Sequence, residues 1–313
     1  IDNSIGDRMN KATFGEMFEN TWTTFKENYG ACLLFTIIAL LLSLFSSVVI
    51  TVIGLQTSDI ENIYPTSIAV SVATWALQSV VVFPIYALLW IALVRKVRGQ
   101  SEKKSGTFNR LVIICSICGL LTIPSNFMSG LATPGQYEEL KLLPDYFSLM
   151  MEEMKLSENN GLVTADGEST DEAKAINDQM ESLQAQSTKL QEMSSSVWTG
   201  AAGIYGLISF LILIRFQPWA MMIACDPQSK EEGAIECMKS GWALCTGSFG
   251  GIFGTLLLLG LIAFISSMAC FLPGLFFGIP LFMAWVPGVY LVLCLAHREI
   301  PPVVNDEHNQ EFA

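Results

Sequence analysis

Six long stretches of this chain contain no Asp, Glu, Lys, Arg or His, and they constrain its fold more than any other feature. Several exceed the roughly 20 residues that a helix needs to cross a bilayer core of about 30 Å. In lipid, backbone amides and carbonyls must pair within the chain, so such stretches must be helices. The stretches are residues 33–55, 68–94, 111–123, 201–214, 252–272 and 275–296.

The composition agrees with insertion into a membrane. Charged residues make up 15% of the 313 residues, whereas a soluble domain carries about 25%. Two of the six stretches are short, but each continues in apolar sequence beyond a proline, Pro124 in the third and Pro218 in the fourth. The sequence therefore predicts an all-α polytopic membrane protein with six transmembrane helices, three in residues 31–130 and three in residues 196–298.

The distribution of charge predicts the orientation of these helices. Residues 95–110 hold six basic side chains and one acidic side chain, whereas residues 131–195 hold four Lys and thirteen acids, a net charge of −9 out of −12. Basic loops stay in the cytoplasm. We therefore expect both termini, including the tail 299–313, to be cytoplasmic, the insert 131–195 to be extracytoplasmic, and the chain to lie in a cell membrane, the bacterial inner membrane. The acidic balance argues against nucleic acid as a partner.

Residues 1–30 contain an amphipathic helix. Thr13 and Glu16 have the spacing of a capping box, in which each side chain binds the backbone amide of the other residue. An aromatic stripe follows at helical spacing directly before the first span, as in helices that lie at the membrane interface. The stripe consists of Phe14, Met17, Phe18, Trp22, Phe25 and Tyr29, of which we expect Phe14, Phe18, Trp22 and Phe25 to contact the interface.

A second copy of this design is predicted in the C-terminal half. Ser229 and Glu232 have capping-box spacing and open a second interfacial helix, residues 229–245, which carries Trp242 as an interface residue. Chance alignment of apolar sequence is the alternative to an internal parallel repeat. The matches are Trp22 with Trp242, Tyr29 with Phe249, Gly30 with Gly250 and Ser46-Ser47 with Ser266-Ser267 at an offset of 220, and Pro84 with Pro287 and Arg95 with Arg298 at an offset of 203.

The insert 131–195 is predicted to contain two helices. The first covers residues 137–156 and is broken or kinked near Pro144, and the second starts at a capping box formed by Ser169 and Glu172. The second helix carries a coiled-coil seam with steps of three and four. Either this seam packs on the insert's own first helix, or it binds a partner or a second copy. The seam residues are Ala173, Ile176, Met180, Leu183, Ser187 and Leu190, with Ile176, Met180, Leu183 and Leu190 as partner-contact candidates.

Few residues carry chemistry. The chain has no metalloprotease, nucleophile-elbow or phosphate-loop motif, and we expect no enzyme activity, no cofactor and no metal site. The Cys115-x-x-Cys118 pair lies in an apolar stretch, where cysteine acts as a small hydrophobe, and we expect no disulfide. Two glycine pairs of the type small-xxx-small favour close helix packing: Gly247 with Gly251, and Gly250 with Gly254.

Arg215 is the one ionised side chain embedded in a predicted span. An intramembrane charge is a functional candidate, but Arg near a helix end can also extend to lipid phosphate. We therefore keep two roles open for Arg215, lipid contact and conduction or gating. Kinks are predicted at Pro84, Pro218, Pro280 and Pro287.

One region resembles a known family. Residues 218–260 read PWAMMIACDPQSKEEGAIECMKSGWALCTGSFGGIFGTLLLLG, and residues 14–30 read FGEMFENTWTTFKENYG. They resemble elements of bacterial six-helix membrane domains, including those attached to some glycerophosphodiester phosphodiesterases and related uncharacterised multi-pass proteins. The resemblance covers the six spans, omits the insert, and includes no catalytic domain. It implies a membrane module without assigned activity.

The sequence thus favours a non-enzymatic membrane scaffold or accessory subunit. Its partners would be the lipid bilayer and another membrane or extracytoplasmic protein, or a second copy, contacted through the acidic insert. The alternative is a transporter or channel for a small molecule or ion that uses the proline-kinked spans and Arg215.

Overall fold

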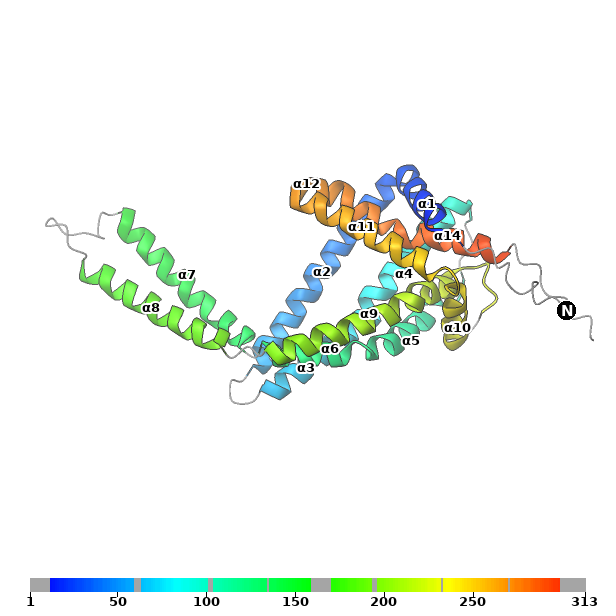
Figure 1. Ribbon diagram of the computed structural model, residues 1–313. Coiled ribbons are helices and arrows are strands. Elements are labelled where there is room, and N and C mark those ends of the chain that lie inside the picture. The colour runs from blue at the N-terminus through cyan, green and yellow to red at the C-terminus, as the bar shows by residue number, and fades with distance from the viewer. Residues whose placement is uncertain are drawn as a thin grey trace, which may run out of the picture. The chain divides into compact units, whose positions relative to one another are not determined.

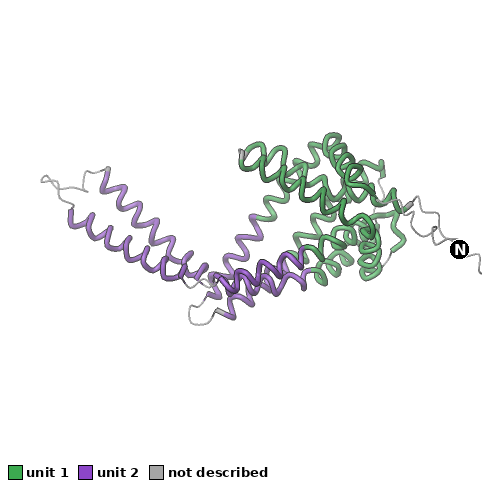
Figure 2. The backbone as a smooth tube through the Cα atoms, in the orientation of Figure 1, with its two compact units in different colours: residues 1–43, 78–118, 211–313 green, residues 44–77, 119–210 purple. Residues whose placement is uncertain are grey.

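The computed structural model describes residues 12–58, 63–100, 104–133, 135–158, 170–192, 196–231, 233–269 and 271–298, and every element in them is helical (Figure 1). The chain divides into two compact units, which are described separately below. Unit 1 contains residues 1–43, 78–118 and 211–313, and unit 2 contains residues 44–77 and 119–210 (Figure 2).

Within the described residues, five helical segments are long and apolar enough to cross a membrane, and a sixth is reached if one bent helix pair counts as a span. This confirms the all-helical, multi-span prediction, with five to six spans. The five segments are α2 (Tyr29–Thr57), Tyr64–Arg98, α9 (Ser196–Cys225), α11 (Phe249–Ala269, tested as Phe249–Met268) and Gly274–His297.

The bent pair consists of α5 (Thr107–Leu120) and α6 (Ile123–Ala132), which meet at 48°. Pro124 lies in the first turn of α6, where its missing N–H costs nothing. At the break, the carbonyl of Leu121 accepts a hydrogen bond of 3.1 Å from the Ser209 hydroxyl of α9. The proline thus ends one helix and starts the next, and a hydroxyl from another helix pairs with a backbone group at the break.

Two other prolines follow π-helical turns. The span Tyr64–Arg98 consists of α3 (Ile63–Leu77), η1 (Gln78–Val82) and α4 (Phe83–Arg98), with Pro84 at the start of α4. A proline ring collides with the carbonyl four residues earlier in a regular α-helix, and a wider π turn relieves this contact. The predicted kink at Pro84 is therefore realised as a π turn.

The C-terminal span repeats this arrangement. It contains α12 (Phe271–Pro273), η2 (Gly274–Gly278), α13 (Ile279–Met283) and α14 (Trp285–Arg298), and Pro280 follows the π turn η2. The carbonyl of Phe276, four residues before Pro280, accepts a hydrogen bond of 2.9 Å from the Tyr29 hydroxyl. Pro84 and Pro280 thus both follow a π turn, whereas Pro287 lies in the first turn of α14. The internal repeat and the match of Pro84 with Pro287 stay predictions.

Unit 1 is built around an apolar core. The helices α1 (Phe14–Glu27) and α10 (Ala234–Leu244) pack on the membrane segments of this unit. Trp219 and Trp285 meet edge to face at 5.8 Å between ring centroids, and the Trp285 indole donates a 3.0 Å hydrogen bond to the buried Thr255 hydroxyl. The polar atoms of Trp285 and Thr255 are thus paired with each other, which offsets the cost of burying them.

The caps of α1 and α10 have different outcomes. The predicted capping box of α1 is confirmed, since the Thr13 amide donates to Glu16 at 2.7 Å and the Glu16 amide donates to the Thr13 hydroxyl. The second interfacial helix, predicted for 229–245, begins instead at Ala234, where the Gly233 amide donates to Glu236 at 3.1 Å. Asp226 and Ser229 shape a turn before it, and Glu232 of the predicted box lies outside the described residues.

Unit 2 contains the helical hairpin and the helices that support its base. The hairpin consists of α7 (Gln136–Glu158) and α8 (Asp171–Glu192), which run side by side in opposite directions (Figure 1). The helix α7 continues through Pro144, so the predicted break there is wrong. At the start of α8, the Ala173 amide donates to the Thr170 hydroxyl at 3.2 Å, one residue after the predicted cap Ser169, which lies outside the described residues.

Candidate functional site

The predicted seam of α8 faces α7. Ala173 and Ile176 are buried there, and the Ser187 hydroxyl donates a 2.7 Å hydrogen bond to Glu139 of α7. The structure supports the first of the two interpretations of this seam, a hairpin that packs on itself. The partner-contact candidates are therefore corrected: the side chains that line the inside of the hairpin are Ile176, Met180, Leu183 and Leu190.

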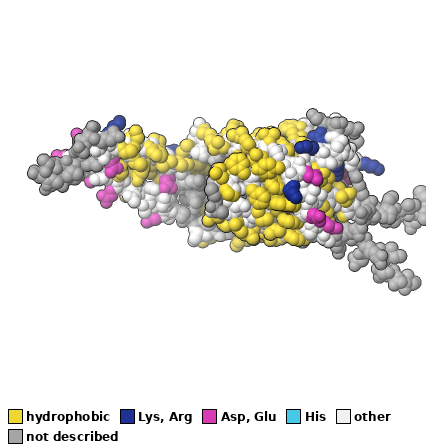
Figure 3. Space-filling view, turned by 90° about the horizontal axis from the view of Figure 1, so that it is seen from above, with side chains coloured by type: hydrophobic (Ala, Val, Ile, Leu, Met, Phe, Trp, Pro, Cys, Tyr) yellow, Lys and Arg dark blue, Asp and Glu magenta, His cyan; other side chains and the backbone are white. Residues whose placement is uncertain are grey.

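A second apolar face on α7 stays uncovered within the described part of the chain. Leu142, Leu149 and Leu156 recur every seven residues and are the less exposed apolar side chains, on the side of α8. On the opposite side, Phe147 is 61% and Met151 is 52% exposed. This outer face of α7 consists of Leu143, Phe147, Met150, Met151 and Met154 (Figure 3).

The outer face follows a pattern that normally indicates a helix partner. Leu143, Phe147, Met150 and Met154 recur at steps of four, three and four, as in a helix-packing seam. A helix with apolar side chains on two opposite faces is usually buried on both sides. Isolated exposed apolar residues are ordinary, but a contiguous apolar face with a polar rim marks an interaction site. Methionine adds flexible, polarizable side chains that adapt to a partner.

Acidic side chains outnumber basic ones on α7. The α7 helix carries Glu138, Glu139, Asp145, Glu152 and Glu153 against Lys141 and Lys155. One of the two lysines already pairs internally, because the Lys141 ammonium lies 2.7 Å from the Glu138 carboxylate. On the side of α8, Glu139 accepts hydrogen bonds from Ser187 and Gln191. The outer face is therefore an apolar surface on a hairpin of net negative charge.

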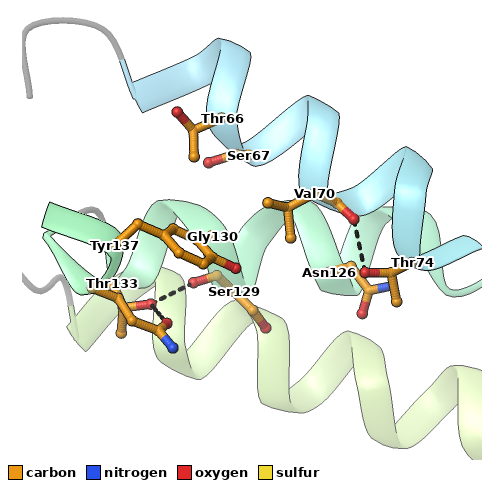
Figure 4. A pocket seen from close by; sticks show the side chains of 10 residues that line it. Thr66, Ser67, Val70, Thr74, Asn126, Ser129, Gly130, Thr133 and Tyr137 are labelled. Atoms are coloured by element: carbon orange, nitrogen blue, oxygen red, sulfur yellow. Dashed lines mark hydrogen bonds between the residues drawn. The ribbon is translucent and has the colours of Figure 1, made fainter. Parts of the chain in front are cut away.

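A polar pocket lies at the base of the hairpin, between α3, α6 and the first turn of α7 (Figure 4). Its volume is about 180 Å³. Eight of the ten described residues that line it carry a hydroxyl, amide or phenol group, the other two are Val70 and Gly130, and none of the ten is charged. They are Thr66, Ser67, Val70, Thr74, Asn126, Ser129, Gly130, Thr133, Gln136 and Tyr137.

Two glycines allow the elements around this pocket to approach closely. A Cβ at Gly130 of α6 would lie 2.8 Å from the Ser67 hydroxyl oxygen of α3. At Gly54 of α2, a Cβ would collide with the Tyr137 ring. The missing side chains thus place the Tyr137 ring beside α2 and the hydroxyl groups of α3 opposite α6. Burial raises the pKa of Tyr137 above its ordinary value of 10.0, so this phenol stays neutral at physiological pH.

One polar atom at the pocket has no partner. The Asn126 side-chain amide nitrogen is buried and finds no hydrogen-bond acceptor among the described residues. Others are satisfied internally: the Thr74 hydroxyl donates to the Val70 carbonyl at 2.7 Å, and the Thr133 hydroxyl lies 3.2 Å from the Gln136 side-chain oxygen. A buried donor without an acceptor costs about 1–3 kcal/mol, so the Asn126 amide is suited to an acceptor that enters the pocket.

The predicted interface aromatics divide into two groups. Phe14 and Trp242 are exposed, and Phe18 and Trp22 are partly buried. Phe25 is buried, with its ring 5.7 Å from that of Phe277, so it contacts protein and its predicted interface role is corrected. The stripe on α1 therefore serves chiefly to pack this helix on unit 1, while membrane contact of the other four residues stays a prediction.

Arg215 stacks on Trp242, one of the residues predicted to lie at the membrane interface. Its guanidinium lies 4.1 Å from the centroid of the Trp242 ring and 5.8 Å from that of Phe249. Such a stack stabilises a partly desolvated cation. This contact does not distinguish lipid contact from conduction or gating, and both roles of Arg215 stay predictions.

Two of the four predicted packing glycines lie at a close contact between helices, and two do not. A Cβ at Gly251 would lie 3.2 Å from the Met17 sulfur, and one at Gly254 would lie 3.2 Å from the Phe14 ring, so both allow α1 to approach α11. The other two need correction. Gly250 has open space around it, and Gly247 has a φ of +85° in the turn before α11, a conformation that glycine adopts readily.

Sequence reasoning missed a buried charge cluster in unit 1. The Asp226 carboxylate is 2.7 Å from the Arg98 guanidinium and accepts a 2.9 Å hydrogen bond from the Tyr290 hydroxyl. It also accepts the Gln228 amide at 2.9 Å. The available signal was a single Asp directly after one apolar span and an Arg at the end of another. The cluster joins the C-terminal ends of α4 and α9 to the middle of α14, which suits a structural role.

The described cysteines are free thiols. Seven of them are present in the described part of the chain, and within it no three His, Cys, Asp or Glu side chains gather as a metal site would require. Cys115 and Cys118 are buried in the core of unit 1, where the Cys115 sulfur lies 3.4 Å from the Met221 sulfur. Their surroundings are those of small hydrophobic side chains.

Comparison with protein-family models, curated protein sequences and solved structures gives no match to this chain. The resemblance to bacterial six-helix membrane domains therefore stays a prediction.

Proposed function

We propose that this chain is a non-enzymatic membrane scaffold or accessory subunit whose hairpin binds a partner protein through the outer face of α7. The observation that carries this proposal is the uncovered face itself, with Phe147 61% and Met151 52% exposed. Packing of α7 on α8 explains why the side of α7 that faces α8 is apolar. It does not explain why the outer face is apolar as well.

The charge of the hairpin favours one kind of partner, a protein with an apolar groove and a basic rim. Residues 131–195 carry a net charge of −9, so two copies of this hairpin repel each other. A basic rim would instead attract the hairpin and fix its register. We therefore propose a basic partner protein, and self-association of two hairpins is the alternative that the experiment below distinguishes from it.

The magnitude of apolar burial also favours a partner that adds electrostatic attraction. Full burial of one Leu, Met or Phe side chain contributes about 1.5–3 kcal/mol. Five side chains that are roughly half exposed therefore contribute about 4–8 kcal/mol on docking. Association itself costs about 4–15 kcal/mol in lost freedom of motion, so charge complementarity is needed for a stable complex.

The proposed setting follows from the charge distribution. The basic loop 95–110 would lie in the cytoplasm with both termini, and the hairpin would extend from the opposite side of a bacterial inner membrane. The family resemblance of residues 218–260 supports this setting and implies a membrane module without catalytic activity. In this orientation the partner is an extracytoplasmic protein or the extracytoplasmic part of a membrane protein.

Site-specific photocrosslinking tests the proposal. A photoreactive amino acid at Phe147 or Met151 samples the outer face, and one at Ala185 of α8 samples an exposed position on the back of the hairpin. We expect a protein adduct of one mass from both α7 positions and none from Ala185, with a yield that falls at high salt because the hairpin is charged. An adduct with the mass of two copies of this chain would show that the outer face mediates self-association and would exclude the proposed basic partner. Equal labelling at Ala185, or no protein adduct at either α7 position, would refute docking through this face.

A further inference from the structure

We infer that the pocket at the base of the hairpin binds a small, uncharged, polyhydroxylated group, either a free sugar or polyol or the sugar headgroup of a lipid. This inference goes beyond the proposed docking function and does not depend on it. It rests on the lining of the pocket, its volume, and the unpartnered Asn126 amide, all within unit 2 (Figure 4).

The lining selects against charged ligands. Its described residues supply hydroxyl, amide and phenol groups and no ionised side chain. An ion that entered would lose its water without gaining an opposite charge, which costs several kcal/mol. A neutral ligand loses less, and its hydroxyl groups can each donate to and accept from the side chains of Ser, Thr, Asn and Gln. The pocket therefore suits a neutral ligand with many hydroxyl groups.

The unpartnered amide provides a specific contact. The buried Asn126 nitrogen needs an acceptor, and a ligand hydroxyl oxygen supplies one. Tyr137 also lines the pocket, and its aromatic ring occupies the space that a side chain at position 54 would otherwise fill, because residue 54 is glycine. A polar side chain opposite an apolar ring matches the two kinds of surface on a sugar, whose hydroxyl edges are polar and whose C–H faces are apolar.

The volume sets the size of the ligand. At about 30 Å³ for each water molecule, the 180 Å³ of the pocket would hold roughly six waters. A group with on the order of 6 to 12 non-hydrogen atoms, from glycerol to a hexose, displaces that amount of water. Ordered water alone would fill the same space, so the experiment must separate a bound ligand from water.

Ligand binding can be measured by saturation-transfer NMR on the purified full chain in a detergent without sugar, such as lauryldimethylamine oxide. The ligands are D-glucose and glycerol, the charged analogues gluconate and glucosamine, and octyl glucoside below its micellar concentration as a lipid-like glycoside. We expect saturable binding of neutral ligands with a Kd on the order of millimolar and at least about tenfold weaker binding of both charged analogues. Glucose binding at least as tightly as octyl glucoside indicates a free sugar, and tighter binding of octyl glucoside indicates a lipid headgroup.

Two pocket variants and a matched control make the test specific. Asn126→Leu removes the unpartnered donor and Tyr137→Phe removes the phenol, and each should weaken binding by about tenfold. Tyr146→Phe makes the same change on an exposed part of α7 and should bind like the unmodified chain. Tyr137→Phe retains the ring, so it keeps the test decisive if Asn126→Leu does not fold. No saturable binding up to about 100 mM, charged analogues that bind equally well, or pocket variants that match Tyr146→Phe would each overturn the inference.

Discussion

Removal of the Asp226 carboxylate should destabilise the protein more than removal of any exposed acidic side chain. Asp226 is 3% exposed and accepts hydrogen bonds from Arg98, Tyr290 and the Gln228 amide. Asp226→Ala leaves these three donors without their acceptor. The Arg98 charge then stays at the end of α4 with no opposite charge beside it.

The expected magnitude follows from the burial of the pair. Removal of one partner of a buried ion pair costs about 3–5 kcal/mol. The Arg98 side chain keeps 13% of its surface exposed, so water reaches part of it, and we expect the lower end, about 3 kcal/mol. The double variant Arg98→Met with Asp226→Leu should recover at least half of this loss, because no unpaired charge remains.

The free energy of unfolding can be measured by titration with sodium dodecyl sulfate in mixed micelles, with tryptophan fluorescence as the signal. The control is Glu138→Ala, which removes an ion pair of the same 2.7 Å length whose Lys141 side chain is 41% exposed. It should cost less than about 1 kcal/mol. A loss below about 1 kcal/mol for Asp226→Ala, or a double variant as unstable as the single one, would refute the reasoning.

Three further predictions concern packing, pH and topology. Gly288→Ala should lower the free energy of unfolding by about 1–3 kcal/mol in the same titration, because its Cβ would lie 2.6 Å from a backbone atom of α1. The control Gly260→Ala has open space around the new Cβ and should leave the stability unchanged or raise it. Hydrogen bonds of the capping box lower the pKa of Glu16 below its ordinary 4.5. The small stabilisation by this carboxylate is therefore complete above the ordinary pKa of the unfolded chain and is lost as the pH falls through the lower, folded pKa, so Glu16→Gln should flatten the stability curve in this acidic range. In living cells, a cysteine at Ser157 should react with an impermeant thiol reagent and a cysteine at Ser105 should not, and the reverse pattern would invert the proposed orientation.

The membrane segments and the first cap could be predicted because local rules decide them. Long uncharged stretches leave no alternative to a helix in lipid, and the Thr13 and Glu16 pair needs only residues three apart. The sequence located the seam of α8 but did not identify what packs on it, because periodicity predicts that a helix face is buried without indicating which element buries it. The outer face of α7 follows the same periodicity and was readable from Leu143, Phe147, Met150 and Met154.

The pocket, the π turns and the Asp226 cluster depend on contacts between distant parts of the chain. Asn126 and Ser67 come together only after α3 and α6 pack across Gly130. The π turn before Pro280 combines a local proline with a hydroxyl from Tyr29, almost 250 residues earlier. The Phe25 ring was assigned to the interface because periodicity places it on an apolar stripe, and a stripe that faces protein has the same pattern as one that faces lipid.

The central claim is that the outer face of α7 binds a partner, and one matched pair of variants tests it most directly. With the photocrosslinker fixed at Met151, the yield of the protein adduct is compared between Phe147→Asp and Ala185→Asp, which add the same charge to opposite sides of the hairpin. A carboxylate buried in the contact without a partner costs several kcal/mol, so Phe147→Asp should reduce the yield at least about tenfold while Ala185→Asp leaves it unchanged. An adduct that survives in Phe147→Asp, or that is lost equally in Ala185→Asp, would contradict the claim.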